Sequence, residues 1–163
     1  MSTFDPETIL RVLAQHEVRY VLVGATAARL QGFPRLTADA DITPAIDNDN
    51  LSCLASALRA LNAKVYTESV PDGLMFDFDA KALARAAIWN LITDAGRVDL
   101  IFKPSGTDGF ADLVKTAINF SVFGVEVRVA SLKDILRSKR ASNRPQDRQD
   151  AIVISQMLGD AGP

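Results

Sequence analysis

Cysteine, histidine and tryptophan each occur only once in the 163 residues, as Cys53, His16 and Trp89. A single cysteine cannot form an internal disulfide, and Cys53 lies on an apolar helical pattern, where a buried thiol is expected rather than a nucleophile. One histidine leaves zinc clusters and Ser–His–Asp catalysis without the residues they need. We expect His16 at the exposed end of a helix and Trp89 half-buried on a strand.

Long apolar runs and glycine-rich phosphate motifs are also missing. No apolar segment approaches the ~20 residues needed to cross a bilayer, and the opening MSTFDPET does not read as a signal peptide. We therefore expect a cytoplasmic protein with no membrane partner. The sequence contains neither GxxxxGKS/T nor GxGxxG, which excludes P-loop ATPases and dinucleotide-binding enzymes.

The rest of the composition is typical of one globular domain. Apolar residues make up 48% and charged residues 23%, and the formal net charge is −2. Residues 39–79 carry eight acidic and two basic residues, whereas residues 128–148 carry seven basic and two acidic residues. An acidic centre together with a basic segment suits a metal site next to a binding site for polyanions. The alternative is that the two charged segments are simply solvent-exposed helix faces.

Apolar periodicity, capping residues and turn signals predict helices mixed with short strands and hairpins. Helices are predicted over residues 6–16, 25–30, 51–60, 80–87, from 107 or 108 onward, over 132–142 and over 145–158. Strands are predicted over residues 20–23, 39–43, 64–67, 89–93, 97–102, 120–123 and 125–129. The expected N-caps are Asp5, Asn50 and Ser131. Because strands and helices do not alternate strictly, we predict an α+β fold with a mixed sheet flanked by helices.

Asp39 and Asp41 are separated by one residue on a predicted strand. Side chains two positions apart on a strand point to the same face, so the two carboxylates project side by side. Like charges at that distance repel unless a cation bridges them or one is protonated. Such oxygen ligands suit Mg²⁺ or Mn²⁺ together with substrate phosphates. The pattern predicts a metal site, although an exposed strand could carry the same two acids.

Two further features support this interpretation. Gly24, followed by Ala25 and Thr26, closes an apolar strand where a helix begins, and the free amides of a helix start can bind phosphate. Asp99 lies mid-strand with its neighbours facing the opposite side, as expected beside a cleft. Three carboxylates from two strands could hold two metal ions for phosphoryl transfer. The alternatives are a simple turn at Gly24 and an edge-strand solubility charge at Asp99.

The segments YVLVGAT (20–26), RLTADADI (35–42) and VDL (98–100) resemble the DNA polymerase β-type nucleotidyltransferase superfamily. Over residues 18–155 the chain most resembles minimal nucleotidyltransferases and the nucleotidyltransferase toxins of bacterial toxin–antitoxin and abortive-infection systems. Those proteins also carry a lysine and an Arg–Asp–Asp cluster on a C-terminal helix pair. The matching residues here are Lys139, Arg144, Asp147 and Asp150.

This sequence departs from the family pattern at Ala25, where the family has a second glycine or a serine. The alanine removes a side-chain hydroxyl from the expected phosphate site, and Thr26 could substitute for it. Ala40 is a smaller spacer between the two aspartates than the usual branched residue. Neither change removes an expected metal ligand.

The resemblance implies a single nucleotidyltransferase domain over residues 1–163, with a core over 18–130 and C-terminal helices over 131–158. It implies a Mg²⁺- or Mn²⁺-dependent enzyme that transfers a nucleoside monophosphate from an NTP such as ATP to an acceptor. Asp39, Asp41 and Asp99 are the implied metal ligands and catalytic residues. The implied nucleotide- and phosphate-binding residues are Gly24, Ala25, Thr26, Arg35, Thr37, Lys139 and Arg144.

The implied acceptors are a tRNA 3′ end, a protein hydroxyl or a small molecule such as an aminoglycoside. The basic segment 128–148 favours RNA, because phosphate contacts dominate affinity for nucleic acids. The resemblance also implies a cognate antitoxin as a partner. The alternative function is a catalytically weakened nucleotide-binding or regulatory protein that acts through a protein partner. A helix-turn-helix DNA reader formed by the last two helices fits the sequence less well.

Overall fold

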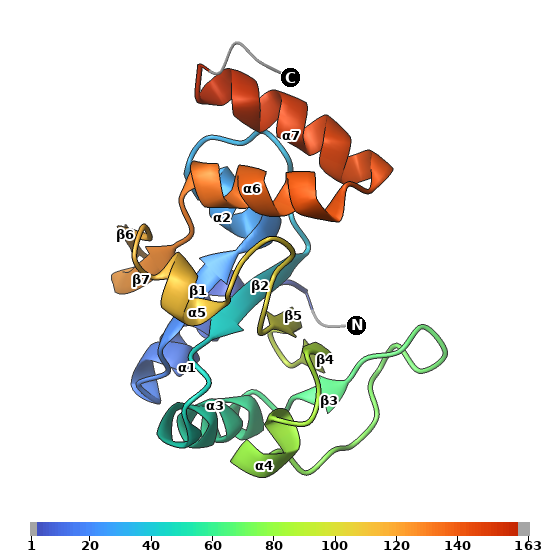
Figure 1. Ribbon diagram of the computed structural model, residues 1–163. Coiled ribbons are helices and arrows are strands. Elements are labelled where there is room, and N and C mark those ends of the chain that lie inside the picture. The colour runs from blue at the N-terminus through green and yellow to red at the C-terminus, as the bar shows by residue number, and fades with distance from the viewer. Residues whose placement is uncertain (1–2, 160–163) are drawn as a thin grey trace.

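A seven-stranded mixed sheet forms the centre of the computed structural model, which describes residues 3–159 (Figure 1). The strand order is β3-β4-β5-β2-β1-β7-β6. The pairs β1·β7 and β2·β5 are parallel and the other neighbouring pairs are antiparallel. The strands are β1 (Tyr20–Val23), β2 (Asp39–Pro44), β3 (Lys64–Val65), β4 (Ile88–Thr93), β5 (Gly96–Ile101), β6 (Ile118–Val122) and β7 (Val125–Val129).

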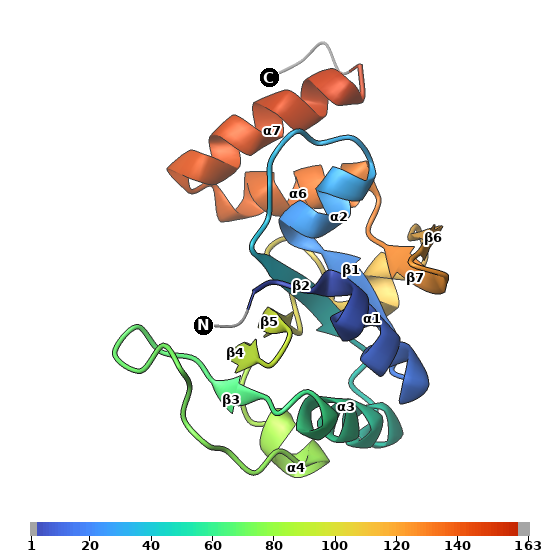
Figure 2. The same ribbon diagram turned by 180° about the vertical axis from the view of Figure 1, so that it is seen from behind.

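Helices pack at both ends of this sheet, and α6 and α7 form the predicted C-terminal pair (Figures 1 and 2). The helices are α1 (Pro6–Gln15), α2 (Gly24–Leu30), α3 (Asn48–Ala60), α4 (Ala80–Leu83), α5 (Phe110–Leu113), α6 (Leu132–Ser142) and α7 (Pro145–Met157). The pair α6–α7 lies next to α2, whereas α3 and α4 lie at the opposite end of the molecule. This arrangement confirms the predicted α+β fold with a mixed sheet. None of the helices described between residues 3 and 159 is long and apolar enough to cross a membrane.

The boundaries of two short helices were predicted wrongly. α4 ends at Leu83 rather than at residue 87, and the Leu83 carbonyl accepts a hydrogen bond from Trp89 Nε1 at 3.1 Å. α5 begins at Phe110 rather than at residue 107 or 108. Thr107 instead forms a turn with Pro104, and Gly109 precedes the helix with a φ of +80°. That left-handed backbone is incompatible with a helix that starts earlier.

The sheet separates a buried face from a face that is available to a ligand. All four residues of β1 are buried, as the continuous apolar run predicts. Along β5 burial alternates strictly, so that Val98 and Leu100 enter the core while Asp99 and its neighbours two positions away stay partly exposed. The functional side chains of β2 and β5 therefore share one accessible face.

Asn50 is a buried polar residue rather than the predicted cap of α3. The cap is Asp47, which accepts a hydrogen bond from the Asn50 backbone N–H at 3.1 Å. The Asn50 amide donates to the carbonyls of Arg19 (2.9 Å) and Ala45 (2.8 Å) and accepts from the Arg19 backbone N–H (2.7 Å). The side chain thus joins the start of α3 to the residues that flank β1 and β2.

We expect Asn50→Ala to lower the free energy of unfolding by about 2–4 kcal/mol, because it leaves buried backbone groups without partners. Urea unfolding at pH 7 measures the change. The control is Asn48→Ala, which removes an exposed side chain from the same helix and should change stability by less than about 0.5 kcal/mol. Equal effects of the two substitutions would contradict the structural role of Asn50.

Candidate active site

Three carboxylates meet on the accessible face of the sheet, two from β2 and one from β5. The parallel register sets Asp41 opposite Asp99 and Asp39 opposite Arg97. One oxygen from each of the three aspartates lies within 4.8 Å of the others. β5 lies between β4 and β2, so the edge-strand explanation for Asp99 is wrong. The structure therefore brings together all three acids that the sequence singled out.

Burial and the neighbouring carboxylates destabilise the charged form of Asp41. Burial, reinforced by the charges of Asp39 and Asp99, raises the pKa of Asp41 to about 7. Burial also raises the pKa of Asp99, while the neighbouring Arg97 guanidinium opposes that shift. A divalent cation would relieve this repulsion, and closely spaced carboxylate oxygens are suitable ligands for it. The triad could therefore hold a metal ion.

Gly24 gives the triad room on its remaining side. Its φ is +71°, and a Cβ atom at this position would overlap Asp41 Oδ2. Gly24 and Ala25 line the same cleft as the triad, at the first turn of α2. Backbone amides in a first turn have no intrahelical acceptor and can face an anion. The glycine is therefore required by both backbone conformation and space, which a simple turn would not demand.

Thr26 and Thr37 have a local role in the structure. The Thr26 hydroxyl donates to the Asp39 carbonyl at 2.9 Å and to Thr37 Oγ1 at 3.2 Å. Among residues 3–159, neither threonine belongs to the set that lines the cleft. These bonds fix the start of β2 and hence the position of Asp39. A role for either hydroxyl in phosphate binding stays a prediction.

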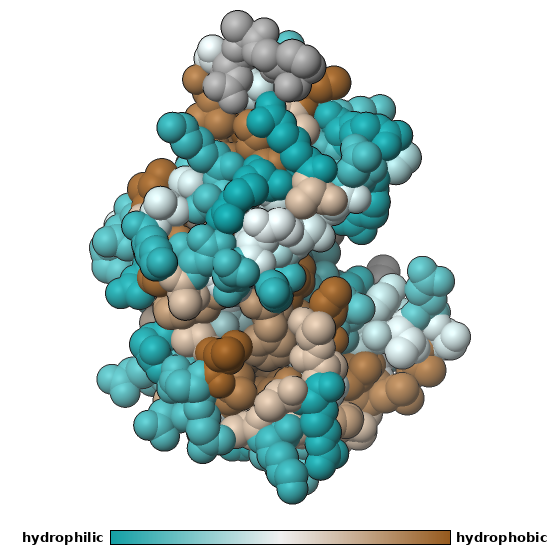
Figure 3. Space-filling view, in the orientation of Figure 1, coloured by the Kyte–Doolittle hydropathy of each residue, from teal (hydrophilic) through white to brown (hydrophobic). Residues whose placement is uncertain are grey.

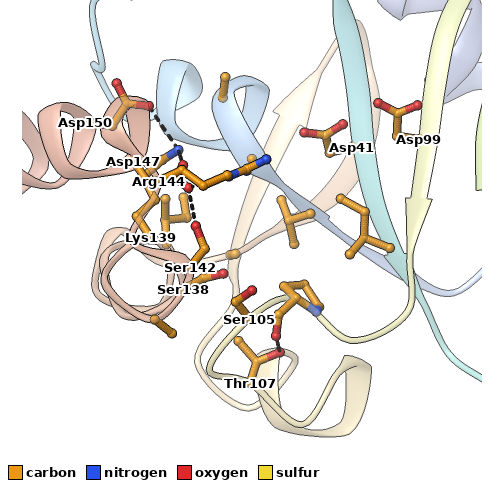
Figure 4. A pocket seen from close by; sticks show the side chains of 18 of the residues that line it. Asp41, Asp99, Ser105, Thr107, Ser138, Lys139, Ser142, Arg144, Asp147 and Asp150 are labelled. Atoms are coloured by element: carbon orange, nitrogen blue, oxygen red, sulfur yellow. Dashed lines mark hydrogen bonds and ion pairs between the residues drawn. The ribbon is translucent and has the colours of Figure 1, made fainter. Parts of the chain in front are cut away.

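A network of charged side chains forms the opposite wall of the cleft (Figure 4). Lys139 Nζ lies 3.0 Å from Asp150 Oδ2 and 3.4 Å from Asp147 Oδ1. Arg35, from the loop between α2 and β2, forms an ion pair with Asp150. Arg144 Nε lies 2.8 Å from Asp147 Oδ2. The structure thus places Arg35, Lys139 and Arg144 in one cluster, across the cleft from the triad.

The two aspartates of this network are anionic partners rather than further metal ligands. Although burial raises the pKa of Asp147, hydrogen bonds from Ser142 and Arg144 and the charge of Lys139 bring it to about 2. Within this network three cations outnumber two anions, while Asp134 of α6 adds a further negative charge to the same side of the cleft. The cleft therefore has an acidic triad on one side and three cationic groups on the other, which suits a metal-bound polyphosphate.

Arg97 and Asn90 are site residues that the sequence analysis did not identify as functional. Arg97 Nη2 donates to Asp99 Oδ1 at 3.1 Å, and its guanidinium carbon lies 3.8 Å from the centroid of the Tyr66 ring. Tyr66 thus holds Arg97 against Asp99. Asn90 of β4 is opposite Asp99 in the hairpin and lines the cleft. The hairpin was predicted with residues 94–96 between its strands, whereas the structure pairs Thr93 with Gly96 across a two-residue turn. This shorter turn shifts the register by one residue and sets Asn90 opposite Asp99.

The cleft has a volume of about 1120 Å³ and extends beyond the charged groups. The loop that follows β5 contributes Ser105 and Thr107, and α6 contributes Ser138 and Ser142 (Figure 4). Ser138 and Ser142 lie one helical turn apart and flank Lys139, so their place on the cleft face follows from helix geometry. No local signal identifies Ser105, whose position depends on how the loop packs.

Comparisons with known proteins show the same fold. No protein-family model matches the chain, and no curated protein matches its sequence. The solution structure of the antibiotic-resistance factor ANT(2″)-Ia is similar with a TM-score of 0.56 and 16% identity, over 93% of this chain and 81% of that chain. The crystal structure of TM1012, a candidate nucleotidyltransferase from Thermotoga maritima, is similar with a TM-score of 0.54 and 18% identity, over 98% of each chain. The chain has the polymerase β-type nucleotidyltransferase fold that the resemblance implied.

The raised pKa of Asp41 predicts how stability depends on pH without divalent cations. The folded protein keeps the Asp41 proton up to about pH 7, whereas an unfolded aspartate ionises near pH ~3.9. The stabilisation is therefore complete below about pH 4 and is lost as the pH rises to about 7. Because Asp41→Asn cannot ionise, its stability relative to the wild type should increase by about 2 kcal/mol between pH 5 and pH 8.

Urea unfolding in EDTA at both pH values measures this difference. Asp49→Asn, at an exposed position of α3, is the control and should show no such change between the two pH values. An Asp41→Asn effect that is the same at pH 5 and pH 8 would show that the pKa of Asp41 is not raised in the folded protein.

Gly24→Ala should be more damaging than the same substitution at Gly124. Both glycines have a positive φ, +71° and +76°, but a Cβ at Gly124 meets no atom within 4 Å, whereas one at Gly24 overlaps Asp41. Both variants should lose about 1 kcal/mol from backbone strain. Gly24→Ala should lose a further ~1–3 kcal/mol from overpacking and should weaken Mn²⁺ binding. Urea unfolding and Mn²⁺ titration test this, and matching results for the two variants would contradict it.

Proposed function

We propose that the chain is a Mg²⁺-dependent nucleotidyltransferase, which transfers a nucleoside monophosphate from an NTP to an acceptor hydroxyl. This proposal rests on the triad, whose three carboxylates each have an oxygen within 4.8 Å of the others. The triad lies where α2 begins at Gly24. A cationic wall across the same cleft supplies a place for the negatively charged polyphosphate. The fold supports the same reaction class, because it is the nucleotidyltransferase fold.

Asp39, Asp41 and Asp99 would hold the metal ions. Their close oxygens and the missing Cβ at Gly24 fit a compact, strongly charged group. Bound Mg²⁺ would neutralise charge on the attacking and leaving oxygens of the phosphoryl group. Arg97 donates to Oδ1 of Asp99, and Asp99 also shares a hydrogen bond with Asp41. In this proposal the proton of that shared hydrogen bond would be replaced by the metal.

The remaining residues bind the nucleotide and move the proton. The first-turn amides of Gly24 and Ala25 face the outer phosphates, and Arg35, Lys139 and Arg144 balance their charge from the other wall. The acceptor oxygen forms a bond to the α-phosphorus while the bond to the β-phosphate oxygen breaks and pyrophosphate leaves. Asp99 takes the proton of the acceptor hydroxyl. The ion pairs of Lys139 fix its ammonium group before the nucleotide binds.

An RNA 3′ end, such as that of tRNA, is the acceptor that the charge distribution favours, with a protein hydroxyl second. The basic residues of segment 128–148 include Lys133 and Arg140, both exposed on α6. We also include in the proposal a cytoplasmic toxin role with a cognate antitoxin, on the basis of the resemblance. ANT(2″)-Ia is an antibiotic-resistance factor, so a small-molecule acceptor belongs in the same test.

A second candidate is a nucleotide-binding protein that has weak turnover and acts through a partner. Ala25 supplies no hydroxyl to the phosphate site, and the Thr26 hydroxyl is engaged with the Asp39 carbonyl. Magnesium-dependent ATP binding without pyrophosphate release from any NTP would favour this candidate. Pyrophosphate release at a measurable rate would exclude it.

The test incubates the protein with each α-³²P-labelled NTP, Mg²⁺ and either tRNA, a protein extract or an aminoglycoside mixture. We expect label to enter one acceptor and pyrophosphate to appear in equal amount. Asp39→Asn and Asp41→Asn should each reduce transfer at least ~100-fold, because they remove groups that hold charge in the transition state. Asp49→Asn, which carries the same substitution on α3, should retain activity. Undiminished transfer by Asp41→Asn would refute the mechanism.

A further inference from the structure

The loop between β3 and α4, residues 66–79, projects from the edge of the sheet, and we call it the arm (Figures 1 and 2). Three consecutive large apolar residues lie in its returning half. Leu74, Met75 and Phe76 are 48%, 83% and 42% exposed. Apolar and hydrophilic surfaces lie side by side on this part of the molecule (Figure 3). Contiguous exposed apolar side chains of this size are typical of an interaction site.

At Leu74 the arm pairs with β3 like the start of a further strand, but the residues that follow Leu74 are not paired. Leu74 exchanges two hydrogen bonds with Val65, the last residue of β3, at 2.9 and 2.8 Å in an antiparallel bridge. The backbone N–H and C=O groups of residues 75–77 have no hydrogen-bond partner within residues 3–159. Alternate residues of a strand present their backbone groups on opposite sides, and those of Leu74 face Val65. The groups of Met75 and Asp77 therefore form an open edge to which another strand can be added.

Packing holds this edge in place. Phe76 contacts the rings of Phe78 and Trp89, each with a centroid distance of 5.1 Å. At Gly73 a Cβ atom would lie only 2.7 Å from Ile92 Cγ2, so the returning backbone lies directly against the sheet. A preorganised segment pays less conformational entropy on binding than a mobile one.

The charge of the arm identifies the kind of partner. Its acidic residues are Glu68, Asp72, Asp77 and Asp79, and residues 66–79 contain no lysine or arginine. None of the four acids forms an ion pair in the described part of the chain. Asp79 caps α4, whereas Asp72 and Asp77 lie on either side of the exposed apolar residues 74–76 in the sequence. This charge repels nucleic acids, anionic lipids and the arm of a second copy, and it attracts a basic protein segment.

We propose that the arm binds an extended segment of a partner protein in which basic and apolar residues alternate. The segment adds as a strand along residues 75–77 and pairs with the free backbone groups of Met75 and Asp77. Its apolar side chains pack on Leu74, Met75 and Phe76, and its basic side chains face the acids on either side. No residue of the candidate active site takes part, so the proposal is independent of nucleotidyl transfer.

The first experiment uses the full chain and an acetylated, amidated peptide of four Lys-Val repeats as the probe. ¹⁵N NMR titration should show shifts centred on residues 74–77. An N-methylated form of the peptide, which has the same charge but lacks the donors of one edge, should bind at least ~10-fold more weakly, because strand addition depends on main-chain hydrogen bonds. A Glu-Val peptide should not bind.

Variants of the protein separate charge from strand pairing. Asp72→Asn with Asp77→Asn should weaken peptide binding at least ~5-fold, because rim charges steer and stabilise complementary partners. The control pair Asp49→Asn with Glu126→Gln changes the net charge equally on exposed sites elsewhere and should bind like the wild type. Met75→Pro removes one backbone donor and should abolish the shifts, while its amide spectrum outside the arm reports an intact fold.

Three outcomes would overturn the proposal. They are shifts centred outside the arm, equal binding of the N-methylated peptide, and concentration-dependent self-association through residues 74–77. The last result would assign the arm to a second copy of this chain instead of a basic partner. Because every readout is binding, a failure here is distinct from a failure of nucleotidyl transfer.

Discussion

Asp41 lies between Asp99 on the neighbouring strand and the bare α-carbon of Gly24, and this crowding sets the conditions for the whole site. The parallel pairing of β2 with β5 fixes the two carboxylates side by side. The left-handed turn at Gly24 then lies directly against Asp41, where only the missing Cβ leaves space for the carboxylate. Folding therefore buries Asp41 beside two like charges, and the cost of burial and of repulsion appears in its raised pKa. A bound cation would offset this repulsion, so the triad is suited to hold one.

In the opposite wall of the cleft the buried charge is positive, and negative side chains compensate it. Lys139 is largely buried on α6, and the Asp147 and Asp150 carboxylates of α7 compensate its charge. Arg35 reaches Asp150 from the loop before β2, so a single residue of α7 connects the C-terminal pair to the segment that leads into the triad. Buried ion pairs contribute little net stability, but removing one partner is costly, and this fixes their geometry. The two walls thus keep a set distance and orientation.

Local rules account for much of this site. The period of two along a strand placed Asp39 and Asp41 on one face. The hairpin was also predicted, but its turn is one residue shorter than expected, and only that shorter turn sets Asn90 opposite Asp99. The adjacency of β2 and β5 was not predictable, because it joins strands separated by two helices and two further strands. The stacking of Arg97 on Tyr66 depends on that same long-range arrangement. Asn50 was mistaken for a cap because Asp47, three residues earlier, offers the same capping chemistry, and only the packing distinguishes them.

The net charge of −2 conceals a separation of charge across the molecule. The acidic arm extends from the edge of the sheet at β3. The basic residues of α6 lie in another part of the molecule, where α6 packs near α2. The proposed polyanionic acceptor would be attracted to the second region and repelled by the first, and the proposed basic protein segment would behave in the opposite way. The two proposed partners would therefore not compete for one surface. Tyr66, where the arm begins, contacts Arg97 and through it Asp99, so the two binding surfaces remain joined by one short chain of contacts within the sheet.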